Sequence, residues 1–517
     1  MPEYLSPGVY VEEVDKGTKP IEGAGTACAA FVGFAEQGPV NEPTFIPNWT
    51  EFTNTFGGFV EGSYLANAVF GYFLNGGGRC YVTRLPGGGE QPQPKAIAAL
   101  PSHSQASIES LSITALEAGP TGAEITVEVV KPSGEDVSEE MFNLIVRGGG
   151  AEETFEKLSF GKGKGVRNAV DVVNRQSKLI RVAEKESQLS IAERAPNPGT
   201  YKLTVSEPTT TALANISSDE IVGDAEERTG LSGFEVADDV TMVCVPDLMA
   251  LYQAGIISMD GVKSVQLAMI AHCELMKDRF AILDCPPGLK PQQIKNWRMN
   301  EAGYDTKYGA VYYPWIRVAD PTGKNDSILI PPSGYMAGIY ARSDNERGVH
   351  KAPANEVVRG AMALEMQITK GEQDILNPIG VNCIRSFPGR GIRVWGARTL
   401  SSDASWRYIN VRRLFNFVEK SIQMGTQWIV FEPNDADLWA RIRRDITAFL
   451  STVWGSGALF GATASQAFYV KCDAENNPPA TRDLGQVIIE IGMAPVKPAE
   501  FVIFRISQWA SGSETSE

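Results

Sequence analysis

The side chains that most often carry out chemistry are few in this sequence and lie far apart. Residues 280–284 read Phe-Ala-Ile-Leu-Asp, an apolar run ending in a carboxylate, as in strands that hold Mg²⁺ beside a nucleotide. Such a strand works together with a GxxxxGK(S/T) phosphate loop. The Gly-Lys pairs at 161, 163 and 323 lack both the upstream glycine and the following hydroxyl. We therefore interpret Asp284 as a turn carboxylate at the end of a buried strand.

The histidines and cysteines form no pattern typical of a metal or nucleophile site. His272 and Cys273 are neighbours in a predicted helix, so their side chains point to different faces and cannot share a ligand; His103 and His350 stand alone. The cysteines show no CxxC pair, which favours buried thiols in a reducing compartment; they lie at 28, 80, 244, 273, 285, 383 and 472. Neither GxSxG nor HExxH occurs. We expect no catalytic residue, no metal ligand and no cofactor.

Composition limits the remaining classes of function. A formal net charge of −15 argues against general nucleic-acid binding, which favours basic faces. No apolar run is long enough to span a membrane, so we expect no membrane insertion. The first residues, Met-Pro-Glu-Tyr, lack the basic and apolar parts of a signal peptide. We therefore expect a protein of a cytoplasm, or one released from it by lysis, and 517 residues predict several domains.

The patterns of strands and helices alternate along most of the chain and predict a mixed α/β fold. Short apolar strands are expected at 26–34, 79–85, 240–246, 280–283 and 309–313. Helices are expected at 49–59, 65–74, 261–276, 290–299 and 357–366. These segments predict one discontinuous α/β middle domain, formed by residues 26–86 and 232–378.

A β-rich domain is predicted between the two parts of this middle domain, at residues 87–231. A Gly/Pro-rich linker opens it at residues 87–94, short strands dominate from 108 to 205, and a polar return linker is expected at 209–233. Residues 105–240 contain 24 Asp and Glu against 13 Lys and Arg, a balance of −11. We expect this inserted domain to face solvent on the outside of any assembly.

Residues 379–492 are predicted to form a compact C-terminal α/β domain. Strands are expected at 408–411, 427–431, 466–472 and 487–491, and Asn434 is the expected N-cap of a helix at 435–453. From 379 to 450 there are 11 Lys and Arg against 6 Asp and Glu, so this domain is basic within an acidic protein. Two interpretations stay open: a mixed surface without a partner, or a basic helix face that contacts an acidic partner.

The two chain ends, residues 1–25 and 493–517, are predicted to be extended arms. Each contains a strand-like segment with no obvious hairpin partner, although residues 487–491 could pair with the second. The alternatives are frayed ends and strands that add to the sheet of another chain. The second alternative assigns intermolecular contacts to Gly8, Val9, Tyr10, Val11, Glu12, Phe501, Val502, Ile503 and Phe504.

Motifs near both ends of the sequence resemble those of contractile tail sheath proteins from phage tails, R-type bacteriocins and contractile injection systems. The C-terminal matches are Trp-Arg-Tyr-Ile-Asn-Val-Arg-Arg at 406–413, Gln-Trp-Ile-Val-Phe-Glu-Pro-Asn at 427–434 and Ala-Pro-Val-Lys-Pro-Ala-Glu-Phe at 494–501. Segments 5–13, 332–340 and 348–354 also fit, in the right order. The resemblance is weaker between about residues 85 and 231.

The resemblance implies a structural, energy-storing polymer without an enzymatic step. Subunits would stack as six-fold rings around an inner tube protein, in a metastable extended state that contracts to drive the tube through a target envelope. Baseplate and terminator or cap proteins would be further partners, and the terminal arms would join sheets of neighbouring subunits. The C-terminal domain would lie innermost, with one helix on the tube or a neighbour; the helix residues assigned to this contact are Asp437, Arg441, Arg444 and Asp445.

Two other classes remain as alternatives to a contractile sheath. A non-contractile baseplate or adhesin-type module would also be acidic, divided into domains and poor in catalytic motifs. A nucleotide-driven motor would need a phosphate loop, and the sequence has no GxxxxGK(S/T) motif.

Overall fold

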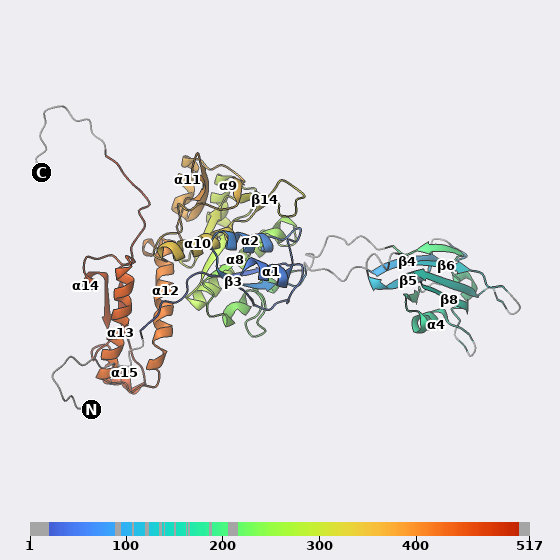
Figure 1. Cartoon of the computed structure of the whole chain (residues 1–517), viewed down its shortest axis with the longest axis horizontal. Coiled ribbons are helices and arrows are strands. Elements are labelled where there is room, and N and C mark those ends of the chain that lie inside the picture. The colour runs from blue at the N-terminus through green and yellow to red at the C-terminus, as the bar shows by residue number, and fades with distance from the viewer. Residues whose placement is uncertain are drawn as a thin grey trace, which may run out of the picture. The chain divides into compact units, whose positions relative to one another are not determined.

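The computed structural model divides the chain into two compact units (Figure 1). Unit 1 comprises Met1–Pro86 and Ile216–Glu517, and unit 2 comprises Gly87–Asn215. The structure describes residues 20–87 and 216–505 without a break. Between them it describes residues 95–204, apart from 106–107, 119–121, 123, 134–136, 139, 149–150, 162, 164–165 and 186–188.

Unit 1 is built on an eight-stranded sheet with the order β18-β17-β13-β12-β11-β1-β3-β2. Its inner strands β17 (Val381–Phe387), β13 (Gly309–Tyr313), β12 (Phe280–Asp284), β11 (Met242–Cys244), β1 (Cys28–Gly33) and β3 (Arg79–Arg84) are parallel. The edge strands β18 (Gly391–Val394) and β2 (Thr44–Ile46) are antiparallel to their neighbours. The central strands β1, β11, β12 and β13 read as nearly continuous apolar runs because helices cover both faces of such a sheet.

Six main helices belong to this sheet: α1 (Trp49–Phe56), α2 (Leu65–Leu74), α7 (Asp247–Gln253), α8 (Met259–Met276), α9 (Pro291–Asn296) and α10 (Ser333–Arg347). Helices α2 and α10 share one apolar core with the strands. They approach so closely that a Cβ atom on Gly334 or Gly338 would lie 2.4 Å from a backbone oxygen of α2. A small sheet, β15 (Ser327–Ile330), β14 (Ile316–Ala319) and β16 (Ala361–Leu364), and helix α11 (Lys370–Leu376) complete this lobe.

The C-terminal lobe of unit 1 is formed by α12 (Ile409–Gly425), α13 (Ala436–Gly455), short helices α14 (Ala464–Ala467) and α15 (Pro479–Asp483), and the antiparallel pair β19 (Phe468–Lys471) and β20 (Glu490–Met493). Helix α12 joins the lobes, because Ile409 packs in the core of the large sheet while Leu414 and Val418 pack in the C-terminal core. Helices α12 and α13 are in contact through Phe417 and Phe449, whose ring centroids are 6.1 Å apart.

Several predictions for the C-terminal segment are wrong. The strand predicted at 408–411 is not formed, because Tyr408 is the N-cap of helix α12 and residues 409–411 are its first turn. Residues 427–429 form a 3₁₀ turn, and Phe431 is fully exposed instead of buried in a strand. The N-cap of α13 is Asp435, whose Oδ1 accepts the backbone N–H of Leu438 at 2.8 Å, and not Asn434.

Two predicted boundaries also differ from the structure. Strands β17 and β18 belong to the large sheet through β13, so residues 381–394 are not part of the C-terminal lobe. Residues 357–366 do not form a helix, since Ala361–Leu364 is strand β16 on β14. The strands predicted at 466–472 and 487–491 correspond to β19 and β20, the second shifted toward the C-terminus.

Unit 2 has its own apolar core between two antiparallel sheets. One sheet contains β4 (Lys95–Pro101), β5 (Glu109–Ala118) and β9 (Ile180–Glu184); the other contains β10 (Gly199–Lys202), β6 (Thr126–Val130), β7 (Phe142–Gly148) and β8 (Ala151–Leu158). Helices α4 (Ala169–Gln176) and α5 (Ile191–Arg194) accompany them. Burial alternates along β6 and β7, as expected where one face of each strand lies on the core.

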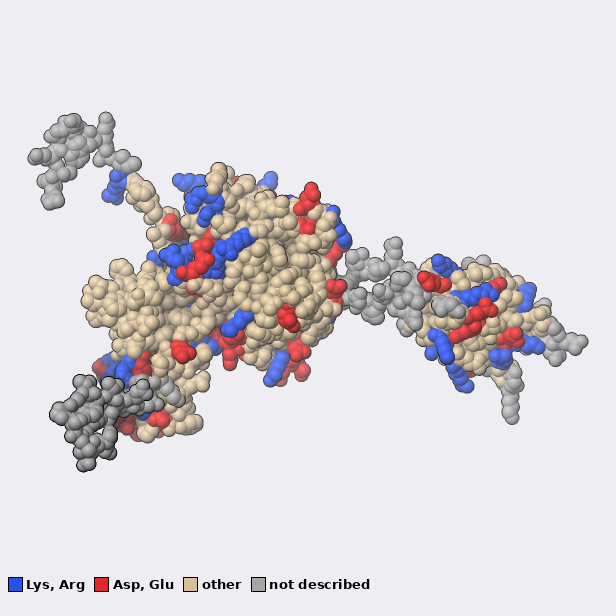
Figure 2. Space-filling model, viewed as in Figure 1, with Lys and Arg blue, Asp and Glu red and all other residues tan. Residues whose placement is uncertain are grey.

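The return to unit 1 occurs earlier than predicted, and this changes the charge of unit 2. Helix α6 (Ser218–Val222) and the 3₁₀ helix Ser232–Val236 lie in unit 1, where Ile221 and Leu231 are buried. Residues 216–240 carry eight Asp and Glu against one Arg, whereas residues 87–215 carry 17 against 13. The acidic excess assigned to the inserted domain therefore lies mostly on unit 1. On the face in Figure 2, acidic and basic side chains are interspersed on both units.

Candidate functional site

The carboxylate of Asp284 ends a strand whose sequence is similar to the Mg²⁺-binding strands of nucleotide sites. In this structure it accepts hydrogen bonds from another part of the chain. It accepts the backbone N–H of Ser333 at 2.9 Å and the Ser333 hydroxyl at 2.5 Å, at the start of α10. The group is buried, and this burial raises its pKa to about 7 although the two hydrogen bonds lower it. Asp284 therefore holds α10 against the end of β12, in agreement with its interpretation as a turn carboxylate.

A second buried carboxylate, Asp247, fills the place where open parallel sheets commonly bind ligands. In this sheet the chain order reverses between β1 and β11, and ligands favour the crevice at the carboxyl ends of such a strand pair. Asp247 accepts N–H groups of Phe34 (2.6 Å), Leu65 (3.1 Å) and Tyr64 there, and the hydroxyl of Ser63 (2.8 Å). The protein's own carboxylate thus occupies the helix N-terminus where a ligand anion could bind.

Sequence reasoning missed Asp247, although its position directly after the predicted strand 240–246 is a usable signal. Burial raises the pKa of this carboxyl to about 6, while its hydrogen bonds lower it. Gly33, the last residue of β1, permits the arrangement, because a Cβ atom there would lie 2.5 Å from Asp247 Oδ2. The contacts of this carboxylate make it a structural group that fixes α2.

The histidines and cysteines in the described residues also have structural environments. Arg279 Nη1 donates to His272 Nε2 at 2.8 Å, and burial lowers the pKa of His272 to about 4, with Arg279 adding to the effect. All seven cysteines are free and buried, and burial raises the pKa of each thiol. No group of three or more His, Cys, Asp or Glu in the described parts of the chain could hold a metal ion. The helices within those parts include none both long and apolar enough to cross a membrane.

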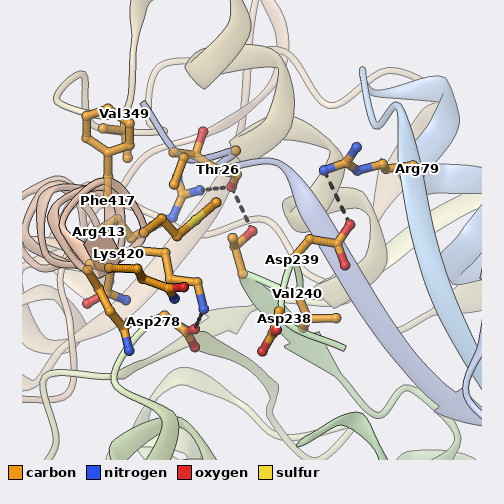
Figure 3. A pocket seen from close by; sticks show the side chains of 17 residues that line it. Thr26, Arg79, Asp238, Asp239, Val240, Asp278, Val349, Arg413, Phe417 and Lys420 are labelled. Carbon is orange, nitrogen blue, oxygen red and sulfur yellow. Dashed lines mark hydrogen bonds and ion pairs between the residues drawn. The ribbon is translucent and has the colours of Figure 1, made fainter. Parts of the chain in front are cut away.

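A cavity of about 410 Å³ in unit 1 lies where α12 meets the amino ends of the parallel strands (Figure 3). Lys420 pairs with Asp278 at 2.8 Å, and Arg79 pairs with Asp239 at 3.3 Å. Arg413 donates to the carbonyl of Thr26 at 2.8 Å. The three basic side chains of this cavity are therefore already paired with groups of the protein itself.

The segment that leads to the N-terminal arm is attached to the same helix. Ile21 is buried in the C-terminal core and packs against Gly425, where a Cβ atom would lie 2.8 Å from it. The backbone N–H of Ala24 donates to Ser421 Oγ at 2.9 Å. Residues 8–12, the predicted strand of this arm, lie outside the described residues. The arm therefore begins from a fixed position beside α12.

The C-terminal arm leaves unit 1 as an exposed apolar segment. Phe501, Val502, Ile503 and Phe504 are 70, 69, 79 and 84% exposed. The strand predicted at 500–506 is not formed in the described residues 500–505, and these residues do not pair with 487–491. Four consecutive exposed apolar side chains are unfavourable in water.

The pair β19–β20 offers edges to which such a segment could add. It is a two-stranded sheet within the described chain, so each of its strands has an outer edge without a strand partner there. An isolated two-stranded sheet is marginally stable, and unpaired edge groups favour pairing with another strand. Tyr469 of β19 is half exposed.

The predicted contact helix, α13, has the expected buried apolar face and exposed polar face along most of its length. Leu438, Ile442 and Ile446 are fully buried, and Asp437, Arg441 and Arg444 lie on the exposed face. Asp445 departs from this pattern, because its side chain is only 10% exposed. Arg441 pairs with Glu432 at 3.0 Å and Arg444 with Asp445 at 3.0 Å, while both arginine side chains remain about half exposed (45 and 53%).

The comparisons with known proteins match unit 1 to one family. Residues 246–400 match the model of the phage tail sheath protein central domain, and residues 401–508 match that of the phage tail sheath C-terminal domain. A tail sheath protein of Vibrio phage KVP40 is 28% identical over 192 residues, which are 36% of this chain and 28% of that protein. The match thus spans little more than a quarter of that relative.

Solved structures resemble the chain over nearly its whole length. The helical sheath of the anti-feeding prophage in its contracted state is 25% identical, with a TM-score of 0.58, and the match covers 98% of this chain and 99% of that one. A chain of the anti-feeding prophage baseplate, 6-fold symmetrised, gives a TM-score of 0.57 at the same identity and the same coverage.

Proposed function

Because this chain belongs to the phage tail sheath family, we propose that it is the structural subunit of a contractile sheath. Copies stack as six-fold rings around an inner tube in an extended, metastable state. On triggering, the lattice shortens and drives the tube through a target envelope. The resemblance to a helical sheath in the contracted state, over 98% of this chain, supports this proposal.

The stored energy in this proposal comes from assembly and not from a nucleotide. A polymer trapped in one lattice can release free energy when its subunits reach a lower-energy arrangement. Asp284 and Asp247, the carboxylates nearest to a nucleotide-site pattern, both fix helices of the subunit. The chain itself thus performs a mechanical function.

One observation carries the intermolecular part of the proposal: the exposed apolar segment 501–504 occurs in the same chain as a two-stranded sheet with open edges. We infer that the C-terminal arm of one subunit adds to β19–β20 of another, and that residues 8–12 of a third use the opposite edge. Each net backbone hydrogen bond contributes about 0.5–1.5 kcal/mol, so a four-residue strand contributes several kcal/mol per contact. Such links allow subunits to move apart without dissociating.

Further partners follow from the same proposal. The exposed face of α13, with Arg441 and Arg444, contacts the inner tube or an adjacent subunit. Baseplate and terminator or cap proteins bind the two ends of the stack. Assembly takes place in the bacterial cytoplasm, and the finished particle is a phage tail or is released by lysis.

Removing the N-terminal arm tests the proposal. The variant lacking residues 1–19 is expected to be a soluble subunit with native-like circular dichroism that forms no long sheaths in negative-stain electron microscopy. Ile21 and Ala24, which attach the segment to α12, remain in this variant. Full-length sheaths from the truncated chain would refute arm exchange, and an unfolded subunit would show that residues 1–19 complete their own domain.

A second candidate function is a non-contractile baseplate component, which the resemblance to a baseplate chain favours. Purified protein would then give discrete rings or particles. Striated tubes that become shorter and wider on triggering distinguish a contractile sheath from this alternative.

A further inference from the structure

Glu500 is the residue that ties the chain to the body of unit 1 immediately before the exposed segment 501–504. Its carboxylate accepts four hydrogen bonds. Arg398 donates Nε to Oε1 at 2.8 Å and Nη2 to Oε2 at 2.7 Å. Asn377 Nδ2 donates to Oε1 at 2.7 Å and the Tyr408 hydroxyl to Oε2 at 2.9 Å. Both carboxylate oxygens are therefore fully used.

The three donors come from separate elements that meet at one place. Asn377 begins the short 3₁₀ helix Asn377–Ile379, Arg398 follows β18, and Tyr408 is the N-cap residue of α12. We name this set, with Glu500, the Glu500 socket. Its assembly depends on the tertiary fold, because no two of its members lie within nine residues of one another in the sequence.

Arg398 is itself fixed to the large sheet. Its backbone N–H donates to Asn382 Oδ1 at 2.7 Å, and Asn382 Nδ2 donates to the carbonyl of Arg398 at 2.8 Å. Asn382 lies in β17, is fully buried, and also donates to the carbonyl of Val311 in β13 at 3.2 Å. A force on Glu500 is therefore transmitted to two inner strands of the sheet.

The chain just before Glu500 is held by one side-chain bond from α12, Asn410 Nδ2 to the carbonyl of Val496 at 3.1 Å, and by backbone bonds to the C-terminal lobe. The Val496 N–H donates to the carbonyl of Ala458 at 3.1 Å, and the Phe460 N–H donates to the carbonyl of Ala494 at 2.8 Å. Both bonds join the arm to the segment after α13. They are single backbone bonds at the end of β20, which a pull on the arm would break one after another.

We propose that the Glu500 socket is the mechanical anchor of the C-terminal arm. It fixes the direction in which residues 501–504 leave unit 1, and it passes tension from the arm to the eight-stranded sheet instead of to β19–β20. The partner that applies the tension is a second copy of this chain, so the inference rests on the proposed function. A bidentate Arg–carboxylate pair suits this role because it combines charge assistance with a defined geometry.

The carboxylate stays ionised in this environment. Partial burial raises the pKa of Glu500, but the hydrogen bonds from Arg398, Asn377 and Tyr408 outweigh that effect and hold the pKa below its ordinary value. Glu500→Gln removes the charge while keeping the size of the side chain, and it replaces one acceptor by a donor that faces Arg398 together with Asn377 or Tyr408. This variant is the direct test of the anchor.

Two measurements compare Glu500→Gln with the unaltered chain. A spin label on Val502→Cys reports the mobility of the arm in the isolated subunit, where all seven native cysteines are buried. Electron microscopy reports sheath length. We expect a more mobile label and an association constant between rings that is lower by about tenfold, the change that about 1.4 kcal/mol produces. Because the mean length of a linear polymer follows the square root of this constant, the mean sheath length should fall by about threefold. Unchanged mobility and unchanged length would overturn the anchor.

The controls separate positioning from folding. Glu61→Gln removes a carboxylate that is 79% exposed and pairs with Lys324, outside both the Glu500 socket and β19–β20, and it should change neither measurement. The charge-swapped double variant Arg398→Glu with Glu500→Arg should restore part of the sheath length. If Glu500→Gln loses its native circular dichroism, Tyr408→Phe takes its place as the test variant. It removes one of the four hydrogen bonds and should increase the mobility of the spin label by a smaller amount. Unchanged label mobility in Tyr408→Phe would also overturn the anchor.

A deletion of residues 501–517 distinguishes failure of the anchor from failure of the proposed function. Normal sheaths from this deletion would refute C-terminal arm exchange, whatever Glu500→Gln does. If the deletion abolishes sheaths while Glu500→Gln gives normal length and normal mobility, arm exchange stands and the anchor is wrong.

Discussion

The two units of this chain use different interactions to hold their cores. Unit 1 buries many charged side chains, including Asp247, Asp284, Asp344, Arg279, Arg342, Arg398, Arg412 and Arg413. In the described part of unit 2, the buried polar residues are four serines, at 102, 110, 159 and 177. Burying a charge is costly unless it is paired and hydrogen-bonded, so unit 1 includes interactions that demand one defined geometry.

In our proposal, unit 1, which buries the charged side chains, is also the unit that is attached to other molecules. In unit 1 the buried carboxylates fix α2 and α10, and the buried pair Arg413–Asp344 (2.6 Å) joins α12 to α10. Both arm attachments and the whole region matched by the family models also lie in unit 1. Unit 2 is a sandwich held by apolar burial. We infer that geometric precision is concentrated where force passes through the subunit.

The largest expected effect is that of Asp247→Ala on unit 1. The change leaves the N–H groups of Phe34 and Tyr64 without their acceptor, while the Leu65 N–H keeps Ser63 Oγ at 3.2 Å. We expect a loss of about 2–6 kcal/mol in the unfolding free energy of unit 1, because each buried unsatisfied group costs about 1–3 kcal/mol. Urea unfolding measures the loss, with Asp247→Asn, which keeps one acceptor, as the milder control. An unfolding curve unchanged by Asp247→Ala would contradict the structural role of this carboxylate.

A smaller effect is the pH dependence of the unfolding free energy that Asp284 causes. The pKa of Asp284 is raised by burial to about 7, above its value in the unfolded chain, so the folded state binds this proton more tightly. The stability from this group is present at low pH and is lost as the pH rises through the folded-state pKa. From pH 5.5 to 7.5 the loss is about 2 kcal/mol.

The variant Asp284→Asn isolates this contribution. Its unfolding free energy should fall less between the two pH values than that of the unaltered chain. Unit 2, whose described core buries serines only, should show no comparable dependence. An equal pH dependence in the variant and in the unaltered chain would show that Asp284 does not titrate in this range.

A further prediction concerns the exposed face of α13. The double variant Arg441→Glu and Arg444→Glu should leave the subunit folded, because both side chains are about half exposed. Near-surface ion pairs contribute about 0.2–1 kcal/mol each, but the contact repeats at every subunit, so the yield of tube-filled sheaths should fall. Electron microscopy of particles formed with the tube protein measures the yield. An unchanged yield would remove α13 as a docking element.

The smallest expected effect is the removal of unit 2. Replacing residues 88–215 by a short Gly/Ser linker should leave polymerisation nearly unchanged, because unit 2 has a core of its own. Extending the replacement to residue 232 should yield insoluble protein, since it deletes Ile221 and Leu231 from the core of unit 1. Sedimentation and electron microscopy of both variants test this boundary. Failure of the shorter replacement to polymerise would show that unit 2 contributes to the lattice.

Several features of this protein were determined by local sequence patterns. The strands Cys28–Gly33, Phe280–Asp284 and Gly309–Tyr313 agree with predicted apolar runs, because strands buried on both faces need such runs. The buried face of α13 follows from side chains at helical spacing. The motifs at both ends of the sequence also indicated the family, which the comparisons confirm.

Other features were decided only by tertiary contacts. Residues 408–411 have a local preference for strands, yet they form the N-cap and first turn of α12, because this helix joins two cores. The limits of unit 2 depend on where Ile221 and Leu231 are buried, and a linker-like composition does not reveal this. Asp247 and the Glu500 socket each combine residues distant in sequence, since hydrogen-bond partners are chosen by three-dimensional position. Local patterns thus determined which segments are apolar and regular, while long-range packing decided which carboxylates hold the helices and the arm in place.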